Sequence, residues 1–380
     1  MVRNQVILIG RRMDTALVGV KEFHPQALHL LYTESTSDSF RPFVAMLPEG
    51  IRVDETRIDP YDMASIKDVC RAIKDSLAPD DILQYNVTEG TKVAAGAIVQ
   101  YALSEGDSAV YYTQEGEMID FVTGERRPTE ARICNAEFVK LFGNHLTSYN
   151  MAKEMSSSDI ATAWDVKRFT EQHQKYFQRI QHQYRSFYGG RIEKLPEEFD
   201  VEHIRGMHVV TRGGMLDIRE RGKALFHSEN PLAVRLFFTG RWWEVIVSSI
   251  VYKWDLARHA NAADSEVWRN VEFSGEKQGR TKNELDILVN DRRRLLLIEC
   301  KSGYLGQENV YKLDSTRETY GGDHSKALLV SYYPLDPDLV QKCRDLHVYW
   351  YAPATDVERV SYIHNLPAWL DTIVSEIEPK

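Results

Sequence analysis

The sequence predicts an α/β protein with two domains and a connecting region. Along residues 1–145, apolar stretches of strand length alternate with helical patterns, which predicts a mostly parallel sheet of Rossmann type. Between residues 283 and 301, two β-type runs flank a short polar turn and predict a hairpin in a second sheet. The chain has 380 residues, enough for two domains with separate cores. We expect the first domain at residues 1–145, the connecting region at 146–230 and the second domain at 231–380.

The first domain is expected to alternate strands with helices. Short apolar runs predict the strands, and apolar residues spaced three and four apart predict the helices. Strands are predicted at residues 5–9, 27–33, 51–53 and 82–86, helices at 63–76 and 94–102, and an antiparallel hairpin at 109–113 and 117–122. No Gly-x-Gly-x-x-Gly motif follows the first strand, which argues against a dehydrogenase.

The connecting region is predicted to be packed, because it contains no low-complexity linker. Ser156 is a typical N-cap for a helical segment that ends at Gly189, and residues 207–219 are typical of a further hairpin. In the second domain, Tyr311 and Leu313 are expected to face inward. Helices are predicted there at residues 242–256, 307–320 and 368–377, and later strands at 327–331 and 348–351.

The hairpin of the second domain carries the chemically informative residues. Its second run is almost unbroken in apolar residues, which predicts a central strand buried on both faces. Side chains repeat with period two along a strand, so Glu299 and Lys301 share one face. If the turn centres on Arg292 and Arg293, Asp286 lies directly opposite Glu299, with Cβ atoms about 5 Å apart. Two carboxylates this close at the end of an apolar strand are costly unless a cation joins them.

The carboxylates of Asp286 and Glu299 are therefore predicted to bind Mg²⁺ or Mn²⁺. A hard divalent ion prefers carboxylate and water oxygens and keeps positions open for a substrate phosphate. Lys301 would orient or deprotonate a water molecule, or offset charge on a phosphoryl transition state. This combination predicts metal-assisted hydrolysis of phosphodiesters. The alternative is a strand that ends at the surface with an ordinary cross-strand ion pair.

The loop from Asn86 to Lys92, between a strand and a helix start, is the second informative segment. Its hydroxyl side chains, its glycine and a lysine at a helix N-terminus together suit a phosphate group. The alternative is an ordinary turn followed by a helix cap, for which threonine and glycine are also typical.

Composition and charge restrict the class of protein. The net charge of -9 argues against a protein that coats nucleic acid by bulk electrostatics, although it does not exclude a nuclease. Basic residues lie close to the hairpin in the sequence, and we expect at least half of them to be solvated: Arg280, Lys282, Arg292, Arg293, Arg294, Lys301 and Lys312.

Neither cysteine nor histidine spacing predicts a zinc site. The four cysteines form no Cys-x-x-Cys pair, and the twelve histidines show no ligand spacing. No apolar stretch reaches the ~20 residues of a membrane span, and the start of the chain is typical of a first strand and not of a signal peptide. We expect a cytoplasmic protein without a membrane partner.

The pattern of Asp286 followed by Glu-Cys-Lys at residues 299–301 resembles the core of the PD-(D/E)xK nucleases, which have the restriction-endonuclease-like fold. Leu285 stands where that family usually has proline. The resemblance implies that a glutamate from the preceding helix completes the metal shell, and Glu244 is the matching position. The alternative for Glu244 is a solvated residue in the first helical turn, where the helix dipole favours it.

The order Asn-x-Thr-x-Gly-Thr-Lys after the fourth strand resembles the CARF domain, the sensor of CRISPR cyclic-oligoadenylate signalling. Members of that family often have Gly-Gly where this chain has Glu89 and Gly90. A carboxylate beside bound phosphates would be repulsive, so we expect Glu89 to point away. The resemblance implies that the cyclic oligoadenylate is bound by Gly10, Arg11, Arg12, Thr33, Ser35, Asn86, Thr88, Gly90, Thr91 and Lys92.

A CARF-like domain followed by a PD-(D/E)xK-like domain resembles the CRISPR type III ancillary nucleases. The resemblance implies a homodimer whose two sensor domains share one cyclic oligoadenylate, expected to be cyclic tetra-adenylate, across a two-fold axis. Ligand binding would bring the nuclease domains into a cleavage-competent arrangement. We expect sequence-nonspecific cleavage of DNA, with RNA as a second candidate substrate, in antiviral defence. The alternatives are a non-catalytic nucleotide sensor and a restriction or repair nuclease that needs no cyclic ligand.

Overall fold

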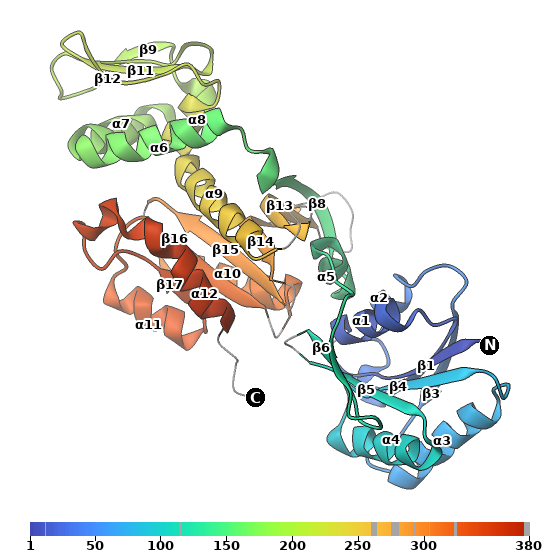
Figure 1. Ribbon diagram of the computed structural model, residues 1–380. Coiled ribbons are helices and arrows are strands. Elements are labelled where there is room, and N and C mark those ends of the chain that lie inside the picture. Colours follow the sequence, from blue (N-terminus) through green and yellow to red (C-terminus); the bar gives the residue numbers. More distant parts are fainter. Residues whose placement is uncertain are drawn as a thin grey trace. The chain divides into compact units, whose positions relative to one another are not determined.

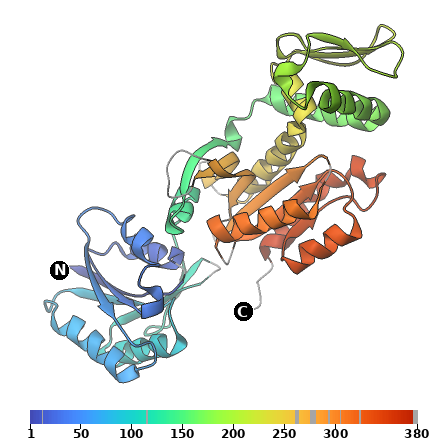
Figure 2. The ribbon, with the colours of Figure 1, turned by 180° about the vertical axis from the view of Figure 1, so that it is seen from behind.

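Figure 1 shows the computed structural model of the protein, and Figure 2 shows it from behind. The structure describes residues 1–11, 13–113, 116–259, 264–274, 281–291, 294–303, 305–322 and 325–375. Contacts within the chain define two units. Met1–His145 forms the first, and Leu146–Asp291 together with Leu295–Lys380 forms the second. Each unit has its own sheet and its own hydrophobic core.

The first unit is built on a single sheet. Its described strands are β1 (Arg3–Leu8), β2 (Ala27–Tyr32), β3 (Arg52–Arg57), β4 (Ile82–Asn86), β5 (Ser108–Tyr112), β6 (Glu117–Asp120) and β7 (Arg126–Pro128). Their order in the sheet is β3-β2-β1-β4-β5-β6-β7. Strands β1 to β5 are parallel to one another, whereas β6 and β7 are added antiparallel. The predicted parallel sheet and the predicted hairpin are both confirmed.

The described helices of the first unit are α1 (Asp14–Phe23), α2 (Arg41–Val44), α3 (Met63–Asp75), α4 (Lys92–Glu105) and α5 (Asn135–Leu141). Helices α3 and α4 were predicted, but α1 was not, and its Gly19 has a low helix propensity. Packing explains this glycine, because a Cβ there would lie 2.5 Å from Nδ2 of Asn86. Helix α1 therefore lies close against the sheet.

The second unit contains a mixed sheet whose described strands follow the order β17-β16-β15-β14-β13-β8. These strands are β8 (His145–Met151), β13 (Val267–Ser274), β14 (Thr281–Asn290), β15 (Leu295–Lys301), β16 (Lys326–Ser331) and β17 (Tyr349–Tyr351). Strand β14 is antiparallel to both of its neighbours, and β16 is parallel to β15 and β17. Strand β15 is central and is buried except at its last residue, as the apolar run predicted.

The described helices of the second unit, of which α9 to α12 pack against this sheet, are α6 (Ser157–Gln172), α7 (Gln174–Tyr188), α8 (Ala233–Thr239), α9 (Arg241–Ala257), α10 (Gln307–Tyr320), α11 (Pro337–Asp345) and α12 (Leu366–Ser375). Ser156 caps α6 as predicted, since its hydroxyl accepts the Asp159 N–H. The predicted helical segment is divided into α6 and α7, because His173 (φ -129°, ψ 42°) leaves the helical conformation. Leu313 is buried, but the inward orientation predicted for Tyr311 is wrong, because Tyr311 is 50% exposed.

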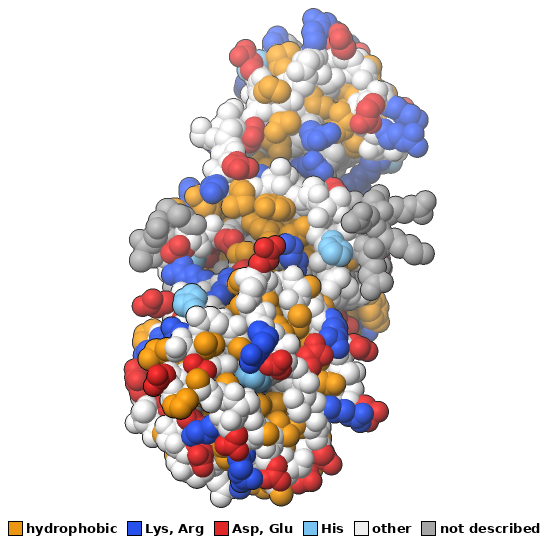
Figure 3. All heavy atoms as spheres, turned by 90° about the vertical axis from the view of Figure 1, so that its right-hand side faces the viewer, with side chains coloured by type: hydrophobic (Ala, Val, Ile, Leu, Met, Phe, Trp, Pro, Cys, Tyr) orange, Lys and Arg blue, Asp and Glu red, His pale blue; other side chains and the backbone are white. Residues whose placement is uncertain are grey.

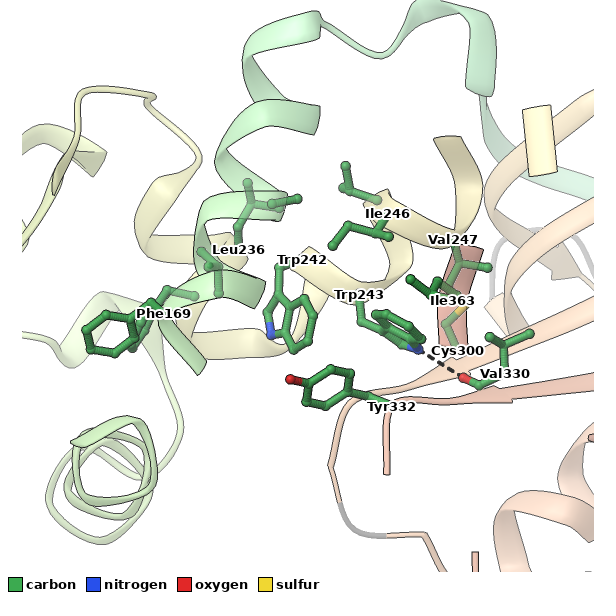
Figure 4. Packing of buried hydrophobic residues seen from close by; sticks show 14 of the residues in the cluster. Phe169, Leu236, Trp242, Trp243, Ile246, Val247, Cys300, Val330, Tyr332 and Ile363 are labelled. Carbon is green, nitrogen blue, oxygen red and sulfur yellow. Dashed lines mark hydrogen bonds between the residues drawn. The ribbon is translucent and has the colours of Figure 1, made fainter. Parts of the chain in front are cut away.

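Residues 146–230 pack into the core of the second unit. They include a small antiparallel sheet of β9 (Glu198–Asp200), β10 (Met207–Val210), β11 (Leu216–Glu220) and β12 (Lys223–Ser228). Phe169 of α6 and the Trp242–Trp243 pair of α9 belong to one hydrophobic cluster with Val330 of β16 (Figure 4). The indole N–H of Trp243 donates a 3.0 Å hydrogen bond to the carbonyl oxygen of Val330. The connecting region and the larger sheet therefore share one core.

The surface shows a mixture of charges. Acidic and basic side chains are interspersed over the face seen in Figure 3. None of the helices in the described ranges combines the length and the apolar character that a membrane crossing requires. With mixed surface charge and a net charge of -9, binding of nucleic acid would depend on individual basic side chains.

Candidate functional site

The hairpin of β14 and β15 positions the predicted catalytic carboxylates. Its register pairs Ile287 with Ile298, as the sequence predicted. The paired register ends there, and Asp286 and Glu299 are the next residues of the two strands. The Asp286 Oδ2 accepts a hydrogen bond of 2.7 Å from the backbone N–H of Cys300. This bond holds the Asp286 carboxylate beside the end of β15.

Lys301 and Glu299 lie on the same face of β15 and contact each other. The Lys301 Nζ is 2.5 Å from Oε1 of Glu299. Burial lowers the pKa of Lys301, but the carboxylates of Glu299 and Asp286 outweigh this effect and raise the pKa above its ordinary value. Lys301 is therefore a cation at neutral pH. This charge state is that of the metal-free site, so both predicted roles of Lys301, acting on a water molecule and offsetting phosphate charge, stay predictions.

Burial raises the pKa of both Asp286 and Glu244. Burial raises the pKa of Asp286 well above its ordinary range, and the negative charges of Glu299 and Glu244 raise it further. Burial also raises the pKa of Glu244, against the opposing charges of Arg241 and Lys301. Acidic groups whose ionisation is disfavoured in this way are stabilised as anions when a cation binds.

The arrangement fits a divalent ion held by Asp286 and Glu299. Mg²⁺ is commonly bound through one or two carboxylates, with water or substrate oxygens at the other positions. When bound, such an ion would lower the pKa of a water molecule and offset charge on a phosphate. In the described ranges, no group of three or more His, Cys, Asp or Glu side chains is arranged to hold a metal ion. Direct ligation by Glu244, in the first turn of α9, thus stays a prediction.

A cleft of about 490 Å³ opens beside these residues. Glu244 and Lys301 line it together with Ser302, which directly follows β15. Gly240 joins α8 to α9 with φ +80°, and a Cβ at this position would lie 2.5 Å from the Ser302 hydroxyl oxygen. Glycine is thus needed both for the left-handed backbone and for the close approach of α9 to the end of β15. Further lining comes from α7.

Arg269 of β13 was missed by the sequence reasoning. Together with Arg241 and Glu244 it lines a second cavity of about 310 Å³. Its Nε is buried and has no hydrogen-bond partner among the residues that the structure describes. Burial lowers the pKa of Arg269, although the charge of Glu244 opposes this effect. No sequence pattern pointed to Arg269, because β13 itself was not predicted.

In the first unit, the predicted ligand residues lie at the carboxyl ends of parallel strands. Gly10 follows β1, Thr33 follows β2, and Asn86 ends β4. Strand β1 lies between β2 and β4, so the chain leaves β1 in one direction and later adds β4 on its other side. This is a topological switch point, the place where open α/β sheets bind ligands.

Several polar groups of the loop after β4 are bonded within the protein. The Asn86 Oδ1 accepts from the backbone N–H and the hydroxyl of Thr88, at 3.2 and 2.7 Å. The Thr88 hydroxyl oxygen accepts from the backbone N–H of Tyr112 at 2.9 Å. The Thr91 hydroxyl donates to the carbonyl oxygen of Pro60 and also caps α4. Ordinary turn and cap contacts therefore explain part of this loop.

The Glu89 carboxylate contacts residues of the same unit, and the expectation that it points away from a bound ligand stays a prediction. Its Oε1 accepts a 3.3 Å hydrogen bond from the Thr15 hydroxyl. A Cβ on Gly10 would lie 2.7 Å from the Glu89 Oε2 and 2.8 Å from the Gly90 backbone nitrogen. The loops after β1 and β4 thus approach each other closely at Gly10 and Gly90, and Glu89 packs against this contact.

The other predicted ligand residues lie around the same edge. Arg11, Ser35 and Lys92 are exposed. The Thr33 Oγ1 is 3.0 Å from the Ser35 Oγ. Arg12 lies outside the described residues.

Comparison with protein-family models gives a match over residues 232–359 to the family described as Card1-like, endonuclease domain. The segment has a Card1-like endonuclease fold. It includes Glu244, Asp286, Glu299 and Lys301, so all predicted catalytic residues lie within the Card1-like segment. Among curated protein sequences, none matches the chain.

Solved structures extend the likeness beyond the Card1-like segment. Can2 from Sulfobacillus thermosulfidooxidans, in complex with cyclic tetra-adenylate, has a TM-score of 0.68 and 19% identity over 98% of this chain and 100% of that chain. Protein VC1899 from Vibrio cholerae has a TM-score of 0.74 and 16% identity over 97% and 98% of the two chains. A type III CRISPR defence DNA nuclease activated by cyclic oligoadenylate has a TM-score of 0.54 and 15% identity over 93% of this chain and 46% of that chain.

At these identities the likeness concerns the fold. The predicted fold class, a CARF-like α/β unit followed by an endonuclease domain, is confirmed.

Proposed function

We propose that this protein is a metal-dependent nuclease of type III CRISPR antiviral defence, activated by a cyclic oligoadenylate. The observation that carries the proposal lies at the end of the paired register of β14 and β15, within the Card1-like segment: the Asp286 carboxylate accepts from the Cys300 N–H, and Glu299 contacts Lys301. Can2, which is similar in fold along nearly the whole chain, binds cyclic tetra-adenylate. A second protein of similar fold is a DNA nuclease activated by cyclic oligoadenylate. These likenesses support cyclic tetra-adenylate as activator and DNA as substrate.

The side chains have distinct parts in the proposed reaction. Asp286 and Glu299 hold Mg²⁺ or Mn²⁺, with Glu244 as a third ligand. The ammonium group of Lys301 orients the attacking water or offsets the charge that develops on the phosphate. As the resemblance to the CRISPR type III ancillary nucleases implies, cleavage is expected to be sequence-nonspecific. DNA is the expected substrate, with RNA as the second candidate.

Activation is proposed to occur in a homodimer. The cyclic oligoadenylate would bind at the edge formed by the ends of β1, β2 and β4, shared by two first units around a two-fold axis. A ligand shifts an equilibrium only by its different affinities for the two states, so the ring must contact the active arrangement more favourably than the inactive one.

The deciding test is cleavage of supercoiled plasmid and of single-stranded RNA with Mn²⁺, with and without cyclic tetra-adenylate. We expect cutting that depends on the ligand, and no cutting by a Glu299→Ala variant. If the Glu299→Ala protein still cuts in the presence of metal, the site assignment is wrong. The substrate that is cut also distinguishes DNA from RNA.

A nuclease without a cyclic ligand is the second candidate function. It is favoured by the hydroxyl groups of Thr88 and Thr91, which are bonded within the protein and serve turn and cap contacts. Equal cutting with and without cyclic tetra-adenylate would establish this function instead. Tight ligand binding without cutting of either substrate would indicate a non-catalytic sensor.

A further inference from the structure

One face of helix α7 lines the cleft that also contains Glu244 and Lys301. The residues on this face are spaced three and four apart, as one helix face requires: Gln178, Gln181, His182 and Arg185. An adjacent face of α7 enters the hydrophobic core through Phe177, Ile180 and Tyr184. Helix α7 is therefore fixed along one side and presents a polar row to the cleft.

Gln181 and Arg185, two residues of this row, differ in their bonding within the protein. The Gln181 Nε2 donates a 2.7 Å hydrogen bond to the carbonyl oxygen of Phe237, which fixes its side chain. Arg185 is exposed and, within the described part of the chain, forms no ion pair. A Cβ placed on Gly303 would lie 3.9 Å from the Arg185 Nη2. The guanidinium group therefore lies near Gly303, two residues after Lys301.

The charges of the cleft suit an anionic strand. Arg185 and Lys301 are its cations, and Glu244 is the single acidic side chain in its described lining. A guanidinium group matches the geometry of phosphate through paired donors and is always charged. About 490 Å³ is the size of a small-ligand pocket and has room for a short piece of a nucleic-acid strand.

We infer that α7 forms a wall of the substrate site and that Arg185 binds a backbone phosphate next to the phosphate under attack. This inference rests on the proposed nuclease function and adds a residue that binds the substrate strand. It also extends the substrate site beyond residues 232–359, the segment with the Card1-like fold.

The test compares Arg185→Ala with Arg179→Ala. Arg179 is an exposed arginine on the same helix that does not line the cleft, so it is a matched control. Cleavage of a labelled single-stranded oligonucleotide is measured with Mn²⁺ and cyclic tetra-adenylate over a range of salt concentrations. For Arg185→Ala we expect KM to rise about tenfold with kcat nearly unchanged, because a charge-assisted hydrogen bond to substrate is lost. The slope of log KM against log salt should fall by about one.

Arg185→Lys should recover part of the affinity, and Arg179→Ala should behave as the unaltered protein. The inference is overturned if Arg185→Ala and Arg179→Ala have the same KM and the same salt dependence, or if kcat falls while KM stays constant. Binding is measured separately by fluorescence anisotropy with Glu299→Ala and the double variant Glu299→Ala/Arg185→Ala. This measurement does not need cutting, so a failure of the proposed nuclease function and a failure of the Arg185 assignment give different results.

Discussion

Asp286 is poorly suited to be a buried anion in the absence of a cation. Burial and the neighbouring carboxylates of Glu299 and Glu244 raise its pKa, while the Cys300 N–H and Lys301 compensate only in part. The ionised Asp286 carboxylate lowers the free energy of unfolding of the metal-free protein, and a bound cation would offset this loss. The same argument places metal binding and protonation of Asp286 in competition, so metal affinity should fall as pH falls.

Replacing Asp286 by asparagine should therefore stabilise the metal-free protein. A carboxyl group with a raised folded-state pKa contributes stability that is fully present below the unfolded value, about 3.9, and is lost as pH rises through the folded value. Asparagine does not titrate, so the stability advantage of Asp286→Asn should grow with pH across this window. Thermal unfolding in EDTA at several pH values measures it.

The control for this change is Asp75→Asn, since Asp75 is exposed at the end of α3 in the first unit. It should show no growing advantage with pH. Added Mn²⁺ should stabilise the unaltered protein and Asp75→Asn, but not Asp286→Asn, because ligand binding to the folded state adds stability only where the site is intact. A constant difference between Asp286→Asn and the unaltered protein at all pH values would contradict the argument.

At the scale of elements, the junction between α8 and α9 controls how the helix with Glu244 meets the end of β15. Gly240→Ala should destabilise the protein by about 1 to 2 kcal/mol through the left-handed backbone. Overlap of the new methyl group with Ser302 should add about 1 to 3 kcal/mol. Cleavage activity should fall as well, because relief of the overlap moves Ser302 or Glu244. Urea unfolding and plasmid cleavage measure the two effects.

Gly189→Ala is the matched control for the junction. Gly189 also has a positive φ, +62°, but a Cβ there meets nothing within 4 Å. It should lose only the stability that the left-handed backbone costs, and it should keep its activity. Equal losses of stability and activity in the two variants would show that the contact with Ser302 has no effect.

The elements that sequence reasoning found are those whose pattern is dictated by burial. Strand β15 is buried on both faces, so its residues are apolar without interruption, and the turn length fixes its register with β14. This register was enough to bring Asp286 and Glu299 together. The carboxyl ends of the strands in the first sheet were also located, because strand–helix alternation fixes where parallel strands end.

The elements that were missed have patterns set by tertiary contacts. Strand β8 is largely exposed and carries polar residues, so it lacks the apolar alternation of a typical strand. Strand β13 contains Arg269 and Asn270, and Asn270 has φ +47°, which is uncommon in a strand. The row of α7 that faces the cleft could not be recognised either, since only the folded chain brings it beside Lys301.

At the scale of the whole molecule, ligand sensing and cleavage are assigned to separate units with separate cores. Glu299→Ala should therefore abolish cutting and leave the response to the ligand intact. At a free ligand concentration of about 100 times Kd, cyclic tetra-adenylate should add about 2.7 kcal/mol to the stability of the unit that binds it. The thermal shift should be the same for the unaltered protein and for Glu299→Ala.

Lys92→Ala should reduce this thermal shift, because Lys92 is exposed at the start of α4 beside the proposed ring. Lys140→Ala is its control, as an exposed lysine of the same unit in the last turn of α5. A reduced shift in Glu299→Ala, or equal shifts in the two lysine variants, would contradict the proposed place of the ligand.

The cleft is lined by segments that lie far apart in the sequence, with α7 before the Card1-like segment and β15 within it. Heritable changes in α7 can therefore accumulate without altering Asp286, Glu299 or Lys301. A lineage can keep its hydrolytic chemistry while exchanging a few exposed side chains on one helix for others. Descendants with identical catalytic strands can in this way diverge in the nucleic acid that they attack.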